Sequence, residues 1–345
     1  MVMQFGIFDH VDRNDRPLAE QLDERIRYVA LAEELGFYCY HVAEHHAAPI
    51  NKVPVPGLFL AAVARATKRI RLGPLVYLLP LYSPLRLIEE VAILDHLSHG
   101  RLEVGIGRGV SPFELNYHNV SYEESRNIFL DAYAALREGL THERLDHAGK
   151  YFTYRDVPME LRPMQRPHPP FWYAASNAES ARWAGEQGTH FCTLGSPKAA
   201  RATIDGFREG LAKRGGAEIP KPEFAGGAAI GVHRQMFVAE TDAEAMMRGK
   251  EFHNQHYLSL TKLRRENREY PGFTRSTPDS FEEAVQQRTI IYGSPARMRE
   301  EIARQIDELG LNYMIGSFYF GNMQDEDALR SLKLFAQEVM PAFRK

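Results

Sequence analysis

The chain has 345 residues, of which 44% are hydrophobic and 25% charged, an ordinary composition for a folded globular protein that argues against disorder. Its 42 basic and 45 acidic side chains give a formal charge of −3, so no overall field favours nucleic acid or an anionic membrane, and a small-molecule partner is expected. No stretch reaches the roughly 18 apolar residues of a membrane span or the pattern of a signal peptide. Cys39 and Cys192 stand alone in apolar runs, which favours buried free thiols and a cytoplasmic protein.

Short apolar runs alternate with longer amphipathic segments from one end of the chain to the other. The predicted strands span 5–8, 38–43, 70–79, 102–106, 171–175, 189–193, 230–238 and 311–318. The predicted helices span 18–35, 58–67, 85–97, 123–140, 178–186, 197–214, 242–259, 295–309 and 326–339. Eight strands, most of them followed by a helix, favour an α/β fold of the (β/α)8 TIM-barrel type over a Rossmann sheet. We therefore expect a single domain over residues 1–345.

One segment breaks this alternation. Residues 260–290, after the seventh predicted strand, mix basic and polar side chains with Pro271, Gly272 and Pro278. Such a mixture is most often a solvated loop. In a barrel, however, an insertion that follows a strand lies at the catalytic end. The pattern predicts an inserted loop and a candidate active-site lid.

The second predicted strand leads directly into Glu44, His45 and His46. The carboxyl ends of barrel strands are where catalytic residues gather. Histidine exchanges a proton near neutral pH, and a neighbouring carboxylate can fix its tautomer or stabilise its charge. The alternative is a structural cluster bonded to the backbone. We take Glu44, His45 and His46 as candidate catalytic residues.

Two further strand ends carry features that suit an anion. The fourth strand is followed by the turn Gly105-Ile106-Gly107-Arg108-Gly109, which combines accessible backbone N–H groups with a fixed cation. The spacing of its glycines is not that of a dinucleotide-binding fingerprint. Ser176 and Asn177 end the fifth strand and precede a helix N-terminus, where an ordinary N-cap is the alternative. Together the two features predict a phosphate pocket.

The same histidines also suggest a second class of chemistry. A metal-dependent hydrolase would use His41, Glu44, His45 and His46 as ligands. Adjacent side chains of a strand point to opposite faces, however, and neither H-x-H nor H-E-x-x-H spacing occurs. No metal site is predicted. The apolar and aromatic residues 77–82 extend the third strand, where they either support a flat ring system or pack into the core.

Several ordered motifs resemble a known family. They are Phe5-Gly6-Ile7-Phe8, Glu44-His45-His46, Leu94-Asp95-His96-Leu97-Ser98-His99-Gly100-Arg101, Gly105-Ile106-Gly107-Arg108-Gly109, Glu124-Ser125-Arg126, Trp183-Ala184, Ser331-Leu332-Lys333-Leu334-Phe335 and Val339-Met340-Pro341. With them the chain resembles, over nearly its whole length, the bacterial luciferase-like family of flavin-dependent monooxygenases, and most closely the luciferase α subunits.

The resemblance implies a TIM barrel that takes reduced FMN from a separate flavin reductase. Reaction with O2 to a C4a-(hydro)peroxyflavin would then oxygenate a small organic substrate, the flavin carrying the difficult chemistry. It also implies a homodimer, formed through helices near the second and third strands. A deazaflavin-dependent oxidoreductase on the same barrel is the main alternative. A non-catalytic flavin-binding subunit is disfavoured, because Glu44-His45-His46 and Arg108 are all present.

The resemblance also assigns roles to single residues. It implies that His45 lies beside the isoalloxazine as the catalytic histidine, that Ser176 meets the flavin ring through its backbone, and that Phe8 lines the floor of the pocket. It implies a phosphate site formed by Arg108, Arg126, Asn177 and Ser180, and a non-proline cis peptide between Leu75 and Val76.

The chain departs from luciferase at two positions. Gly107 replaces a reactive cysteine and Ser176 replaces a glutamate, so light emission is not expected. Loss of bulk at Gly107 is expected to admit a differently shaped substrate. A dry site is needed to protect a reactive flavin adduct, which predicts an apolar pocket around Phe8, Tyr77 and Leu79.

Overall fold

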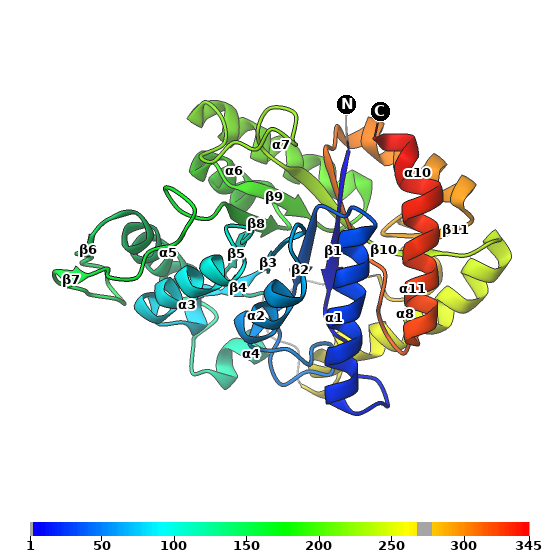
Figure 1. The fold of residues 1–345 in the computed structure, drawn as a ribbon, viewed down its shortest axis with the longest axis horizontal. Helices are drawn as coiled ribbons and strands as arrows, with labels where there is room; N and C mark the ends of the chain where they lie inside the picture. The colour runs from blue at the N-terminus through cyan, green and yellow to red at the C-terminus, as the bar shows by residue number, and fades with distance from the viewer. Residues whose placement is uncertain (1–2, 268–277, 345) are drawn as a thin grey trace.

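In the computed structural model, which describes residues 3–267 and 278–344, parallel strands form a ring with helices on its outside (Figure 1). The strands of this sheet are β1 (Gln4–Asp9), β2 (Cys39–Val42), β3 (Arg71–Pro74), β4 (Tyr77–Leu78), β5 (Val104–Gly107), β8 (Phe171–Ala175), β9 (His190–Thr193), β10 (Ile230–Val238), β11 (Ile290–Gly293) and β12 (Tyr313–Ser317). The predicted α/β TIM-barrel fold is confirmed.

The strand order shows how the ring closes. It runs β3-β2-β1-β12-β10-β9-β8-β5-β4, with β11 paired to β10. Leu72 of β3 forms a parallel bridge with Leu102, just before β5, so the two ends of this order meet. β3 and β4 are the two halves of the third barrel strand. The Leu75–Val76 peptide bond between them is cis, as the resemblance implied.

The surrounding helices are α1 (Leu18–Glu34), α2 (Pro56–Ala66), α3 (Pro84–Leu97), α4 (Pro112–Tyr117), α5 (Ser125–Thr141), α6 (Ala178–Gln187), α7 (Pro197–Arg214), α8 (Asp242–Glu266), α9 (Phe281–Gln286), α10 (Pro295–Leu309) and α11 (Asp325–Leu334). Nine of them lie where the sequence predicted them, whereas α4 and α9 were not predicted. Proline at the first position starts α2, α3, α4, α7 and α10, where its missing N–H leaves no hydrogen bond unmade. A short hairpin of β6 (Arg144–Leu145) and β7 (Val157–Pro158) was not predicted.

Two layers of buried side chains hold the barrel together. The larger layer lies between the strands and the helices. The smaller layer fills the barrel itself, and its buried members include Leu75, Trp172 and Tyr313. β1 approaches this interior so closely that a Cβ added at Gly6 would lie 1.8 Å from the Tyr313 hydroxyl. Only glycine fits there, because the tyrosine already fills the space above the strand.

The region after β10 differs from the predicted loop over 260–290. α8 continues to Glu266, well past the predicted helix end at 259, and α9 covers Phe281–Gln286. Residue 290 then begins β11, a parallel strand that the sequence pattern did not predict. Residues 268–277 lie outside the described residues. The insertion is therefore partly helical, and its role as a lid stays a prediction.

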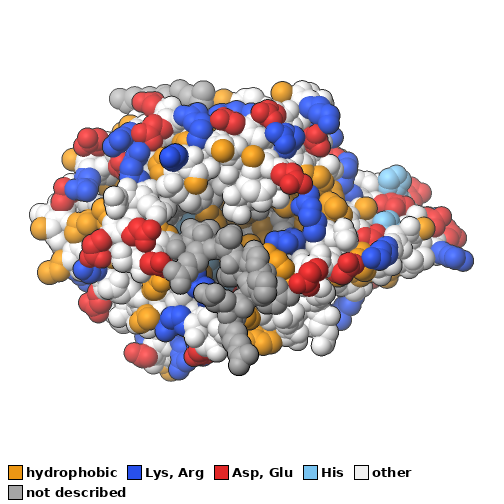
Figure 2. All heavy atoms as spheres, turned by 180° about the vertical axis from the view of Figure 1, so that it is seen from behind, with side chains coloured by type: hydrophobic (Ala, Val, Ile, Leu, Met, Phe, Trp, Pro, Cys, Tyr) orange, Lys and Arg blue, Asp and Glu red, His pale blue; other side chains and the backbone are white. Residues whose placement is uncertain are grey.

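The surface agrees with the balanced composition. On the side opposite to the view of Figure 1, Lys and Arg side chains are interspersed with Asp and Glu (Figure 2). Within the described parts of the chain, no helix is long and apolar enough to cross a membrane. Cys39 and Cys192 are free and buried, as predicted, and burial raises the pKa of the Cys192 thiol to about 12.

Candidate active site

A histidine–carboxylate pair lies at the carboxyl ends of the strands. His45 follows β2, and its Nδ1 lies 3.1 and 3.3 Å from the two carboxylate oxygens of Glu114 in α4. The same carboxylate accepts a hydrogen bond of 2.8 Å from the backbone N–H of His46. Glu114 therefore fixes both the His45 ring and the turn that carries it. With Nδ1 engaged, Nε2 is the atom that His45 can offer to a reactant.

The environment favours the charged form of this pair. Burial by itself disfavours imidazolium, but the charge and hydrogen bond of Glu114 outweigh it and raise the pKa of His45. Burial likewise opposes ionisation of Glu114, yet His45 and the N–H of His46 lower its pKa. The His45 side chain remains 21% exposed, whereas that of Glu114 is 6% exposed. The site thus favours the charged form of His45, and solvent or a ligand can still reach this side chain.

Glu114 was missed by sequence reasoning. Its own segment carries a signal, because Ser111 caps α4 by accepting a hydrogen bond from the Glu114 N–H. That pattern predicts a helix start but not a partner 69 residues away in the chain. The sequence suggested Glu44 as the acid that orients a neighbouring histidine. The structure pairs Glu44 with His46, whereas His45 pairs with Glu114, because successive residues of an extended segment point to opposite sides.

Glu44 has a different role from the one expected. Its side chain is 1% exposed and accepts hydrogen bonds from His46 Nε2, the Leu78 N–H and the Tyr82 hydroxyl, at 2.9, 3.1 and 2.9 Å. Burial raises the pKa of Glu44, although these donors oppose the shift. Glu44 therefore joins the end of β2 to β4, and it positions the turn on which His45 sits.

Aromatic rings surround His45 on its other side. His10, which follows β1, stacks on His45 with ring centroids 5.7 Å apart and planes 23° apart. Phe8 contacts both His10 and His233 edge to face, at 4.7 and 5.0 Å. Burial and the neighbouring histidines hold the pKa of His10 well below its ordinary value. Burial lowers the pKa of His233 to about 3, so of these three histidines His45 alone has a raised pKa.

The predicted anion-binding residues come together from three segments. The Arg108 guanidinium lies over the Tyr122 ring, 4.7 Å from its centroid. Arg126 and Ser180 both interact with the Tyr173 hydroxyl, and the charge of Arg108 also reaches that group. Burial raises the pKa of Tyr173, and these neighbours partly offset it. Two guanidinium groups and a serine hydroxyl therefore lie around one buried tyrosine, as a phosphate site requires.

The helix N-terminus predicted beside this group is present. Asn177 caps α6 by accepting a hydrogen bond of 2.9 Å from the Ser180 N–H. Ser176 and Asn177 are exposed, as is Ala174 in the middle of β8. An exposed residue within a barrel strand is open to the interior, because the outer face is covered by helices. A ligand on α6 would therefore extend over β8.

The packing around Gly107 overturns one expectation. A Cβ added at Gly107 would lie 2.4 Å from Cγ2 of Val76. The volume left by the missing side chain is thus filled by Val76, and no additional room for substrate results. Phe8 and Val76 pack against the buried interior cluster that contains Leu75, so these three predicted residues do lie together.

Two residues of the predicted apolar pocket lie elsewhere. Tyr77 and Leu79 are 0% and 1% exposed and belong to the layer between the strands and the helices. The Tyr77 hydroxyl donates a hydrogen bond of 2.8 Å to Glu90 of α3. Tyr77 in β4 and Leu79 in the 3-10 turn that follows it both pack in this outer layer, so they do not line the site with Phe8.

The ligand set of the hydrolase alternative does not form. His41 is completely buried inside the barrel, and its Nε2 lies 2.9 Å from the Tyr313 hydroxyl. His45 and His46 bond to different carboxylates. Within the described ranges, the histidine and acid side chains close enough to share an ion are His10, Asp12 and His256.

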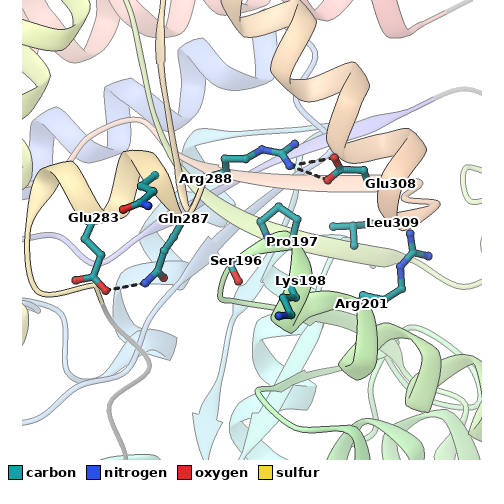
Figure 3. Close-up of a pocket in the computed structure, with 10 residues that line it drawn as sticks. Ser196, Pro197, Lys198, Arg201, Glu283, Gln287, Arg288, Glu308 and Leu309 are labelled. Carbon is teal, nitrogen blue, oxygen red and sulfur yellow. Dashed lines mark hydrogen bonds and ion pairs between the residues drawn. The ribbon is translucent and has the colours of Figure 1, made fainter.

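A separate hollow of about 700 Å³ lies outside the barrel, between α7, α9 and α10 (Figure 3). Its wall includes Lys198, Arg201, Glu283, Arg288 and Glu308. The Arg288–Glu308 pair, at 2.8 Å, neutralises two of these charges. None of the predicted site residues lines this hollow, and we do not assign the reaction to it.

Comparison with known proteins decides the family. The model of the luciferase-like monooxygenase family matches residues 3–313. The chain belongs to the luciferase-like monooxygenase family. A protein of unknown function from Sinorhizobium fredii, y4wF, is 35% identical over 98% of this chain and 96% of its own length. The oxygenase component of a flavin-dependent trigonelline monooxygenase from Acinetobacter baylyi is 28% identical over 99% and 96%. The protein is thus an oxidoreductase of a flavin-dependent monooxygenase family.

Solved structures share the fold over the full chain. The monooxygenase RslO1 from Streptomyces bottropensis has a TM-score of 0.87 and 27% identity, covering 99% of this chain and 100% of its own. The oxygenating constituent of 3,6-diketocamphane monooxygenase from Pseudomonas putida, solved with FMN, has a TM-score of 0.80 at 21% identity and covers 99% of both chains. A coenzyme F420-dependent reductase from Methanopyrus kandleri has a TM-score of 0.74 at 17% identity, covering 99% and 100%. The barrel is therefore shared by enzymes with different flavin-type cofactors.

Proposed function

We propose that the protein is the oxygenase component of a two-component monooxygenase, which uses reduced FMN and O2 to oxygenate a small organic substrate. The observation that carries this proposal is the His45–Glu114 pair at the strand ends, beside an anion-binding group made by Arg108, Arg126 and Ser180. A proton-transfer group and a phosphate-binding group on one barrel end match the two needs of flavin monooxygenation.

The residues present fit a flavin mononucleotide. Two arginines, a serine hydroxyl and the N-terminus of α6 supply charge and donors for one phosphate. Apolar side chains for the ring lie exposed after the ends of β5 and β9, the two strands that flank β8: Val110 at 62% and Leu194 at 47%. Large exposed apolar side chains at a barrel mouth are typical of a ligand site. The fit supports binding of a phosphate and a flat ring by the same mouth.

The bound flavin supplies the redox chemistry with O2, and the protein residues control charge and water. Imidazolium at His45, maintained by Glu114, would stabilise negative charge that develops beside it and return a proton from Nε2. Phe8 and Val76 pack against the apolar interior below and exclude water from that side. Glu44 acts through the turn it anchors and is a positioning residue.

The first test measures cofactor binding. Photoreduced FMN is titrated anaerobically into wild-type protein and into the Arg108→Ala and Arg126→Ala variants, with Arg27→Ala on the far helix α1 as the matched control. Each site variant is expected to weaken binding about 10-fold or more, since a charge-assisted phosphate contact is lost, whereas the control binds normally. Absence of FMN binding, or tighter binding of reduced deazaflavin F420, would overturn the assignment of FMN.

The second test separates binding from chemistry. The reduced complex is mixed with oxygenated buffer, and the rate of flavin oxidation is compared between wild type and His45→Asn. The variant is expected to change this rate by about 10-fold or more while the Kd for FMN stays within about 3-fold. Equal losses of affinity and rate would remove His45 from the reaction and leave it a structural residue.

We also propose two protein partners. The trigonelline enzyme is named an oxygenase component, and on that basis we expect a separate flavin reductase here. For a second copy of the chain, Leu58 of α2 and Ile93 of α3 offer exposed apolar surface, at 76% and 50%. Leu58→Asp is expected to convert a dimer to a monomer in light-scattering measurements, whereas Leu18→Asp on α1 leaves it intact. A wild-type monomer would contradict the homodimer.

A further inference from the structure

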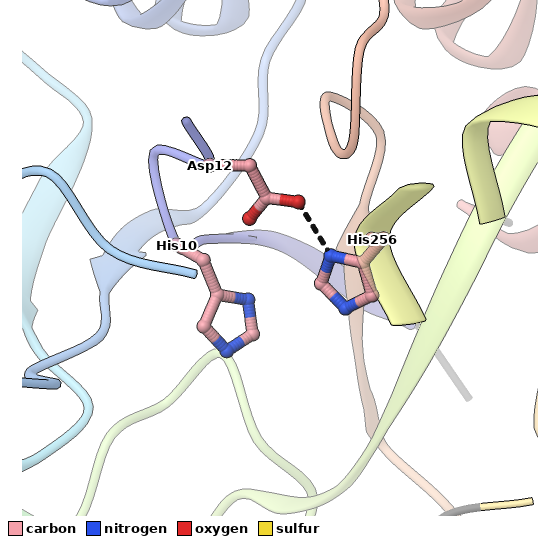
Figure 4. Close-up of side chains that lie close together, drawn as sticks. All are labelled: His10, Asp12 and His256. Atoms are coloured by element: carbon pink, nitrogen blue, oxygen red, sulfur yellow. Dashed lines mark hydrogen bonds and ion pairs between the residues drawn. The ribbon is translucent and has the colours of Figure 1, made fainter. Parts of the chain in front are cut away.

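A second cluster of chemically capable side chains lies next to His45 and has no part in the mechanism above. His10 follows β1, Asp12 lies two residues later, and His256 projects from α8, so that their side chains face one another (Figure 4). One nitrogen of each histidine and one carboxylate oxygen all lie within 4.8 Å of one another. Two segments that are far apart in the sequence, the one after β1 and helix α8, thus present two imidazoles and a carboxylate to one point.

Asp12 is the unusual member of this cluster. Its residue is 1% exposed, and its Oδ2 accepts hydrogen bonds from His256 Nδ1 at 2.7 Å and from the Gly321 N–H at 2.6 Å. Its Oδ1 is also buried but has no hydrogen-bond partner. Within the described ranges, the ion-pair partner of Asp12 is His256, and no lysine or arginine is within ion-pair distance. A buried carboxylate oxygen without a partner is destabilising, so a ligand that supplies positive charge is expected there.

The backbone holds the cluster in place. Gly321 has a φ of +62°, and a Cβ added there would lie 2.2 Å from the carbonyl oxygen of Phe252, one turn before His256 in α8. The turn after β12 and helix α8 are therefore in close contact. Asp12 bonds to both, through Gly321 and His256. Such preorganisation favours coordination over a mobile surface contact.

We propose that His10, Asp12 and His256 bind one divalent transition-metal ion, with Zn2+ and Fe2+ as the candidates. Two imidazole nitrogens and one carboxylate oxygen are a donor set that these ions prefer, and the remaining positions are open to water or substrate. Metal–ligand bonds of about 2.0–2.2 Å hold the donors of a tetrahedral ion roughly 3.3–3.6 Å apart, so the wider separations in the cluster must close and the 2.7 Å His256–Asp12 pair must open slightly. The ion displaces the proton in the His256–Asp12 hydrogen bond, which is released to solvent, and brings positive charge to the carboxylate whose Oδ1 has no hydrogen-bond partner.

The site goes beyond the flavin reaction and does not depend on it. An ion there would join the segment after β1 to α8 and, through Asp12 and Gly321, to the turn after β12. Its ligand His10 stacks on His45, so the ion would also fix the neighbour of the candidate catalytic ring. Metal binding can be measured without flavin, which keeps a failure of this proposal distinct from a failure of the proposed function.

The test is calorimetric titration of Zn2+ into chelator-treated, tag-free protein in the absence of FMN, with Co2+ as a spectroscopic probe. Wild type is expected to bind one ion per chain and to give Co2+ absorption bands in the visible range. Asp12→Asn and His256→Gln are expected to weaken binding by about 100-fold or more, because loss of an outer partner alone costs 10–100-fold. His118→Gln, a histidine that contacts His46 at the same barrel end, is the matched control and should bind as wild type.

Three results would overturn the proposal. The wild-type protein could fail to bind Zn2+ stoichiometrically, or Asp12→Asn and His256→Gln could bind Zn2+ as tightly as wild type. In the third result, His118→Gln would lose as much Zn2+ affinity as these two variants. Circular dichroism and thermal unfolding check that each variant folds. Should Asp12→Asn fail to fold, His10→Gln replaces it, since His10 is only partly buried and is expected to show the same loss of affinity.

Discussion

The ion pair between His45 and Glu114 makes a prediction whose size and pH dependence both follow from the structure. In Glu114→Gln an amide replaces the carboxylate with nearly the same shape. Two unit charges 3.1 Å apart attract by about 5 kcal/mol at an effective dielectric constant of 20. Hydration of the separated groups, and the 21% exposure of His45, reduce the net effect to about 1.5–3 kcal/mol, the range for hydrogen bonds to charged groups.

The pH window follows from the two pKa shifts. The pKa of His45 is raised from 6.5, so its contribution is complete below pH 6.5 and is lost as pH rises through the raised value. The pKa of Glu114 is lowered from 4.5, so its contribution is complete above pH 4.5 and is lost as pH falls through the lowered value. Glu114→Gln should therefore destabilise the fold most between pH 4.5 and 6.5, and least near pH 9.

Urea unfolding at pH 5.5 and at pH 9 measures this difference, and NMR titration of the labelled His45 ring measures its pKa directly. The His45 pKa should fall in Glu114→Gln, because burial then acts without an opposing charge. Glu90→Gln is the matched control, since Glu90 accepts from the neutral Tyr77 hydroxyl and its cost should be the same at both pH values. Equal destabilisation by Glu114→Gln at both pH values, with an unchanged His45 pKa, would refute the reasoning.

Three further predictions concern the framework of the site. Gly107→Ala should lower the free energy of unfolding in urea by about 1–3 kcal/mol, because its Cβ would lie 2.4 Å from Val76. Adding Val76→Ala to the same chain should restore part of that free energy, and strictly additive effects of the two substitutions would contradict the contact. Arg101→Met should lower the free energy of unfolding by about 3 kcal/mol or more, since Arg101 donates five hydrogen bonds, four of them to backbone carbonyls. A loss below about 1 kcal/mol would contradict a stabilising role of these hydrogen bonds. Glu103→Gln should lower the free energy of unfolding by about 3–5 kcal/mol, because it leaves Arg71 without its paired carboxylate. It should also shift the fluorescence of Trp172, whose indole N–H donates a 2.6 Å hydrogen bond to Glu103. An unchanged melting temperature would exclude this stabilising role of Glu103.

The sequence by itself determined most of the architecture. Periodicity separated strands from helices because the two have different repeats, and α7 and α10 begin and end at the predicted residues. It also located the candidate catalytic histidine at the end of β2 and the glycine–arginine turn after β5, because parallel strands place their carboxyl ends at one edge. Local signals sufficed there, since hydrophobic patterning and strand direction are properties of short segments.

Only the tertiary structure decided which groups act on each other. His45 pairs with Glu114, not with its neighbour Glu44, and Val76 fills the space beside Gly107. Asp12 and His256, 244 residues apart, meet only because α8 packs against the strand ends. Such contacts depend on side-chain direction and on closure of the barrel, and neither produces a periodic pattern in the amino-acid sequence. The fold follows from repeating local forces, whereas the chemistry of the site follows from single long-range contacts.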